Sequence, residues 1–147
     1  MITSDLAILQ HLETRLAIVT TTNGYNNNIA GVDREYVERS YDTYPFFFIN
    51  DIDDKYLLRI CKDLYQKALV IQIIGFVYSD RTSSTAPQLG TKLQLLKDDL
   101  RKCLARDTYF NASDIQLDII EIETDSSYVP PQASFVCNLI VLHYDDK

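Results

Sequence analysis

Residues 69–78 read LVIQIIGFVY, and this stretch decides the class of fold. It is shorter than a typical buried helix and rich in β-branched and aromatic residues, so it predicts a strand covered on both faces. Residues 133–144 form a second long strand pattern, with apolar side chains on both faces. We expect this second strand to be central in the same sheet.

Further strand patterns lie before and after the first of these segments. Residues 29–54 predict two strands joined around residues 41–44. Pro45 stands at the start of the second strand, where its missing N–H does least harm to a ladder. Residues 115–122 alternate between apolar and polar until the phase slips at Ile120, which predicts a strand with a bulge.

Two segments show the three-and-four spacing of an amphipathic helix. Residues 6–19 follow Ser4, a good N-cap residue, with the acidic Asp5 in the first turn. Residues 89–104 carry leucines on one side and charged residues on the other. Residues 55–67 fit either a short helix or a strand that leads into a hairpin, and the sequence leaves both open.

The order of these elements predicts an α+β protein with a mainly antiparallel sheet and two principal helices packed on it. No repeat, low-complexity segment or linker divides the chain, so residues 1–147 should form one domain. The most apolar stretch, residues 68–78, is about half as long as a membrane-spanning helix, and Met1 is not followed by a signal-peptide pattern. We therefore expect no membrane association.

The charge and the cysteines exclude several classes of protein. The formal net charge is −7, and Lys and Arg are not clustered, which argues against a nucleic-acid-binding domain. The three cysteines are too widely spaced for a disulfide framework or a CxxC metal knuckle. We expect buried free thiols at Cys61, Cys103 and Cys137.

No catalytic or metal-binding motif is present in the sequence. Neither His11 nor His143 has a second His or a Cys at ligand spacing. The acidic residues 51–54 resemble the start of a calcium loop, but Tyr56 and Lys62 stand where such a loop needs Gly and Glu. We therefore expect no catalytic residue, no cofactor and no metal, and a protein that is not an enzyme.

Tyrosine is the residue type that points to binding. The chain has ten Tyr and no Trp, and Tyr and Arg are enriched at protein interfaces. Tyrosines of the core or of sheet edges are the alternative, which stays open. The predicted interface residues are Arg34, Arg39, Tyr41, Tyr44 and Arg81.

The order of motifs along most of the chain resembles the tail-terminator and tail-completion proteins of long-tailed bacteriophages. The helix at residues 6–19 is followed by YPFFFI at residues 44–49 and by IGFVY at residues 74–78. A second helix then covers residues 89–106, and NLIVLHY at residues 138–144 closes the pattern. The order of these motifs, and no single one of them, carries the resemblance.

The resemblance implies a virion protein that caps the growing tail tube as a ring, usually six-fold, and provides the docking surface for the head. Its implied partners are further copies of this chain, the tail tube protein and a neck or head-completion protein. DNA would pass through the ring without specific binding.

Three other interpretations stay open. The first is another head-to-tail joining protein of the virion, and the second is a small cytosolic binding module with a ferredoxin-like sheet. The third is an enzyme whose site is shared between subunits. Ring formation would separate the virion interpretations from the cytosolic module.

Overall fold

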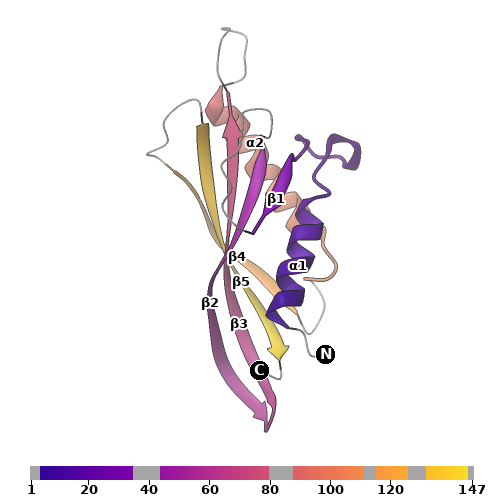
Figure 1. The fold of residues 1–147 in the computed structure, drawn as a ribbon, viewed down its shortest axis with the longest axis vertical. Coiled ribbons are helices and arrows are strands. Elements are labelled where there is room, and N and C mark those ends of the chain that lie inside the picture. The colour runs from indigo at the N-terminus through magenta and orange to yellow at the C-terminus, as the bar shows by residue number, and fades with distance from the viewer. Residues whose placement is uncertain (1–3, 35–43, 80–87, 111–114, 126–131, 146–147) are drawn as a thin grey trace.

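A computed structural model describes residues 4–34, 44–79, 88–110, 115–125 and 132–145. They form two helices packed on a five-stranded sheet, which confirms the predicted α+β class (Figure 1). The elements are α1 (Asp5–Leu16), the short 3-10 helix η1 (Thr21–Asn23), β1 (Gly31–Asp33), β2 (Phe46–Cys61), β3 (Leu64–Tyr78), α2 (Leu89–Ala105), β4 (Gln116–Thr124) and β5 (Gln132–Asp145).

The sheet has the strand order β1-β2-β3-β5-β4, so β3 and β5 lie in its interior, which confirms the central position predicted for β5. These two strands pair antiparallel along almost their whole length, from Tyr65 opposite Asp145 to Tyr78 opposite Gln132. Strand β4 is antiparallel to β5 and has its register shift between Ile119 and Glu121, which confirms the bulge at Ile120.

Residues 55–67 belong to a β-hairpin, which decides between the two alternatives that the sequence left open. Strand β2 runs to Cys61, turns through Lys62 and Asp63, and pairs antiparallel with β3. The preceding strand β1 is parallel to β2. Of the loop predicted at residues 41–44, only Tyr44 lies within the described residues.

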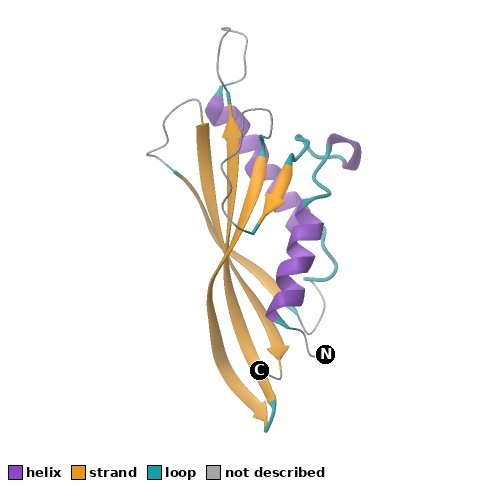
Figure 2. Cartoon of the chain, in the orientation of Figure 1, coloured by secondary structure: helices purple, strands orange, loops and turns teal. Residues whose placement is uncertain are grey.

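The helices cover one face of the sheet, and this arrangement corrects the prediction that residues 69–78 are covered on both faces (Figure 2). Along β5, and along β3 from Leu69 onward, every second side chain is buried, as in a half-covered sheet. The alternate apolar residues of β3, Val70, Ile74 and Phe76, are only partly buried. The buried residues of both helices belong to one core cluster with the buried alternate residues of β3 and β5. Both helices therefore pack on the same side of the sheet.

Helix α1 begins where the sequence predicts, because Ser4 Oγ accepts a hydrogen bond of 3.2 Å from the Ala7 N–H. It ends at Leu16, three residues before the predicted end. Helix α2 closely matches its predicted range. Within the described part of the chain, neither helix is long and apolar enough to cross a lipid bilayer.

Gly75 is required where the sheet meets the second helix. A Cβ atom at this position would overlap the ring of Phe135 on β5 and lie 3.1 Å from Leu96 Cδ2 on α2. Phe135 and Leu96 are both fully buried. The Phe135 ring therefore occupies the space that the absent side chain leaves.

Candidate interaction surface

Strand β2 is buried in its first part and exposed in its second. Phe46, Phe47 and Ile49 belong to the buried core residues, whereas every residue from 51 to 61 is exposed. Strand β1 pairs with Phe46–Phe48 alone. Beyond that point the outer edge of β2 has no partner strand among the described residues. Residues 51–63 are called the arm below.

The arm reaches past the helices to the far end of the molecule (Figure 1). It carries five of the nine large exposed hydrophobic side chains found in the described chain. These are Ile52, Tyr56, Leu57, Leu58 and Ile60, and each is about half exposed, from 49% to 56%. A grouped apolar surface on an open strand edge is typical of an interaction site, because a monomer is expected to protect such an edge.

The tip of the arm is held by hydrogen bonds of its own. Arg59 Nε donates to the Cys61 carbonyl oxygen at 3.2 Å, and Arg59 Nη2 donates to the Lys62 carbonyl oxygen at 3.3 Å.

The exposed Cys61 corrects the prediction of three buried thiols, since only Cys103 and Cys137 are buried. Burial raises the pKa of the Cys137 thiol to about 12 and also raises that of Cys103, which keeps both protonated near neutral pH.

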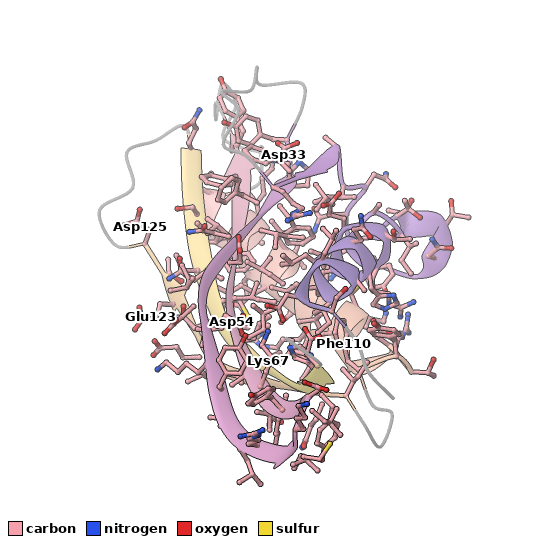
Figure 3. All side chains as sticks on the ribbon, turned by 60° about the horizontal axis from the view of Figure 1, so that its bottom comes forward. Asp33, Asp54, Lys67, Phe110, Glu123 and Asp125 are labelled. Atoms are coloured by element: carbon pink, nitrogen blue, oxygen red, sulfur yellow. The ribbon has the colours of Figure 1, made fainter. Side chains whose placement is uncertain are left out.

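A cluster of charged residues lies at the base of the arm. Lys67 on β3 is 2% exposed, and its Nζ lies 2.9 Å from Asp54 Oδ2 on the arm and 3.2 Å from Asp5 Oδ2 at the start of α1. Asp145 Oδ2 on β5 is 3.5 Å from the same nitrogen, and the ring centroid of Tyr56 is 4.9 Å from it. Figure 3 shows Lys67 and Asp54 next to each other on neighbouring strands. One ammonium group thus links the arm to α1 and β5.

The electrostatics of this cluster follow from the position of Lys67. Burial alone would lower the pKa of Lys67, but its hydrogen bonds with Asp54 and Asp5 raise it above its usual value. The pKa of Asp54 is lowered, since the hydrogen bonds from Asp5 and Lys67 outweigh the opposing effect of burial. Burial and the nearby Asp54 carboxylate raise the pKa of Asp5. At neutral pH Lys67 is therefore the charged centre of the cluster.

Three residues of the cluster also have the donor atoms of a metal site. One ligand atom from each of Asp5, His143 and Asp145 lies within 4.8 Å of the others, and His143 Nε2 is 2.9 Å from Asp5 Oδ1. However, Lys67 Nζ already contacts two of these carboxylates. A metal ion here would have its charge next to a buried ammonium group, which disfavours binding. We interpret the cluster as an ion network that fixes the base of the arm.

The other histidine also joins parts of the fold. His11 Nε2 on α1 is 2.7 Å from Asp107 Oδ2, and its ring stacks on Tyr109 with 4.0 Å between centroids. Asp107 follows the end of α2, so this contact ties the two helices together.

Of the predicted interface residues, the structure describes Arg34 and Tyr44, and it does not bring these two together. Arg34 Nε is 3.3 Å from Glu13 Oε1, so Arg34 ties the end of β1 to α1. Tyr44 lies at the opposite end of the β1–β2 pair, with ring centroids 5.1 Å from Phe46 and 5.7 Å from Tyr78. Arg39, Tyr41 and Arg81 lie outside the described residues.

The described residues line, among others, two shallow pockets on the surface. One of about 160 Å³ is lined by Tyr44, Tyr78 and Lys92, among others. The other, of about 200 Å³, lies between the end of α2 and β4. Both are smaller than the pockets of roughly 300 to 1,000 Å³ in which proteins bind drug-sized ligands.

The second pocket adjoins the free edge of β4, which forms the opposite margin of the sheet from β2. Its apolar lining includes Leu104, Phe110 and Leu117. On β4, Ile119 is 38% exposed and Ile120 is 57% exposed. Glu123 and the following Asp125 project at this margin of the molecule (Figure 3). The strand and its groove therefore form a second partly apolar surface, bordered by acidic residues.

No protein-family model matches this chain, and no curated protein is detectably similar to it in sequence.

Proposed function

We propose that the protein is a self-assembling structural subunit, and specifically a tail terminator that caps the tail tube of a long-tailed phage as a ring. The observation that carries the proposal is the arm, with five half-exposed apolar side chains on an open strand edge. The order of sequence motifs supports the phage assignment. The protein would act by shape and contact, without a catalytic step or a cofactor, in the assembled virion.

The size of the apolar surface supports a contact that forms only with a partner. Full burial of a side chain such as Leu or Ile contributes about 1.5 to 3 kcal/mol, so covering the exposed half of one gives about 1 kcal/mol. Five such side chains would contribute roughly 5 kcal/mol to a contact, before the loss of translational and rotational freedom is subtracted. A single arm contact would thus be weak. A closed ring gives every subunit two contacts, which favours assembly over isolated pairs.

The order of the elements disfavours the ferredoxin-like alternative. A ferredoxin-like sheet follows the order β-α-β-β-α-β. Among the described elements, β2 and β3 come next after β1, and α1 precedes all of the strands. The same assembly argument applies to the alternative of another head-to-tail joining protein. That protein would form its ring at a different place along the virion.

Native mass spectrometry of the full chain over a range of concentrations tests the assembly. We expect a closed oligomer that is weakened in the double variant Leu57→Ser/Leu58→Ser. Leu95→Ser is the control, because Leu95 is also an exposed leucine, at 38%, but lies on α2. A monomer at every concentration, or equal loss of assembly in the control, would contradict the proposal.

Electron microscopy of lysates from a phage with an early stop codon in this gene tests the specific role. Overlong or ragged headless tails are expected, because the growing tube would have lost its stop. Tails of normal length beside filled, unattached heads would instead indicate a joining protein. Intact infectious particles would rule out the virion role.

A further inference from the structure

We propose that the arm of one copy docks on the β4 edge and the adjoining groove of the next copy. This inference rests on the proposed function, because it names the two surfaces through which the ring would form. It commits to one partner, a second copy of this chain. The argument depends on charge, on apolar surface and on open strand edges.

The tip of the arm and the β4 edge differ in charge. The whole arm has three basic and four acidic residues, but three of the acidic ones lie at its base, and residues 55–63 at the tip read KYLLRICKD, with three basic residues and one acidic residue. Residues 116–125 read QLDIIEIETD, with four acidic residues and no basic one. The basic side chains of the tip are Lys55, Arg59 and Lys62. In a chain of net charge −7, a segment with three positive charges is an exception that an acidic partner would complement.

The two surfaces also match in their apolar parts. Leu57, Leu58 and Ile60 are each about half exposed on the arm. Ile119 and Ile120 are exposed on β4, beside the groove of about 200 Å³ that Phe110 and Leu117 help to line. A groove of that volume holds an aliphatic side chain, which would give the contact an apolar centre with charged residues around it.

Both surfaces are strand edges, so backbone hydrogen bonds can extend the sheet from one copy to the next. In the described chain, the outer edge of β2 has no partner strand beyond Phe48, and the outer edge of β4 has none along its length. Addition of a strand to an open edge supplies main-chain hydrogen bonds, while side chains determine the specificity. Acidic side chains at one edge would select the basic tip of the arm.

The position of the two edges makes the contact head to tail. Strands β2 and β4 lie on opposite sides of the interior pair β3 and β5, so an arm reaches the β4 edge of another copy rather than its own. Pairing of two arm tips, residues 55–63, would bring six basic and two acidic residues together, and pairing of two β4 edges would bring eight acidic residues together. Like charges disfavour both two-fold arrangements. A head-to-tail contact generates a ring when its rotation closes.

Cross-linking tests the contact directly, because Cys61 is an exposed native thiol at the arm tip and the other two cysteines are buried. In the variant Ile120→Cys, a short bismaleimide should link Cys61 of one copy to the new thiol of the next. We expect a ladder of dimers, trimers and larger species on a denaturing gel. The ladder should disappear when Cys61→Ser is added, and Gln10→Cys on the exposed face of α1 should give none.

Charge reversal tests the same contact without a cross-linker. The variants Arg59→Glu/Lys62→Glu and Asp118→Lys/Glu123→Lys should each raise the concentration needed for assembly about tenfold or more. The four substitutions together should restore assembly, because the arm and the edge again carry opposite charges. Restoration is the outcome that a general loss of stability would not produce.

The outcomes separate this inference from the proposed function. Assembly without cross-linking at Ile120→Cys, or without any effect of charge reversal, overturns the arm-to-edge contact and leaves the ring proposal intact. Dimers linked only through two Cys61 thiols overturn it too, since they show arms paired by two-fold symmetry. A chain that stays monomeric at every concentration overturns both.

Discussion

The two parts of strand β2 differ in what they do, although they are continuous in sequence. Residues 46–49 (FFFI) lie mostly in the core, whereas residues 51–61 are exposed throughout. Both parts are rich in apolar residues. The difference comes from their surroundings, because β1 and the helices cover the first part alone. Apolar content on its own therefore does not distinguish a core strand from a docking strand.

The largest expected effect is the loss of a core side chain in the first part of β2. Phe47 is fully buried and pairs with Gly75, beside the Phe135 ring. Phe47→Ala should lower the free energy of unfolding by about 3 to 5 kcal/mol, since it leaves a cavity in the core. Urea unfolding followed by circular dichroism measures the loss. A change below 1 kcal/mol would mean that this part of β2 is not in the core.

The second effect concerns Lys67, at the junction between the core and the arm. Lys67→Met removes the ammonium group and leaves the carboxylates of Asp5, Asp54 and Asp145 close together without their cation. Loss of one partner from a buried ion network destabilises by about 3 kcal/mol. Unfolding in urea at pH 7 should show this loss. Equal stability of the variant would show that the cluster does not hold the arm to the body.

The sequence predicted the core parts of the fold better than the arm. The long apolar run of β5 correctly indicated a central strand, whereas the run of β3 indicated cover on both faces and the helices cover only one. The arm has apolar residues too, but they do not alternate with polar ones, since neither of its faces packs on the helices. That is why residues 55–67 fitted a helix as well as a hairpin.

The sequence did not predict the candidate surface, because none of the five predicted interface residues lies on the arm or on β4. Tyr and Arg content directed attention to Arg34 and Tyr44, which the fold places at opposite ends of a strand pair. The charged cluster depends on the register of β3 with β5, which brings Lys67 opposite His143. A signal was present, because a Lys beside an apolar strand and a His within another must find polar partners once buried. The identity of those partners required the tertiary structure.

A smaller effect is expected when the carboxylate that joins the arm to Lys67 is removed. Asp54→Asn should destabilise the protein by about 1 kcal/mol or less at pH 7, since its side chain is 36% exposed and solvent screens the ion pair. Because the folded pKa of Asp54 is lowered, its contribution is present above the unfolded value near 3.8 and is lost as the pH falls through the lower folded pKa. The two proteins should therefore converge in stability below that pH.

Asp53→Asn is the control for this pH dependence. Asp53 is adjacent to Asp54, but its carboxylate is 51% exposed and lies 3.7 Å from Lys55, another exposed side chain. Its substitution should change the free energy of unfolding by less than about 0.5 kcal/mol at every pH. Unfolding curves from pH 7 down to the acid range compare both variants. If Asp53→Asn matched Asp54→Asn, general surface charge would explain the effect and the cluster would not.

The smallest effect on stability is expected in the arm itself, and it sharpens the contrast with Phe47. Leu58 is 56% exposed, so Leu58→Ser removes little buried surface from the monomer and should change the free energy of unfolding by no more than about 0.5 kcal/mol. Unfolding should be measured at a protein concentration too low for assembly, because a partner that covers Leu58 would add its own stabilisation. A larger loss in the dilute monomer would place Leu58 in the core of the chain. If the loss of unfolding free energy grew with protein concentration, Leu58 would instead contribute to a contact between copies.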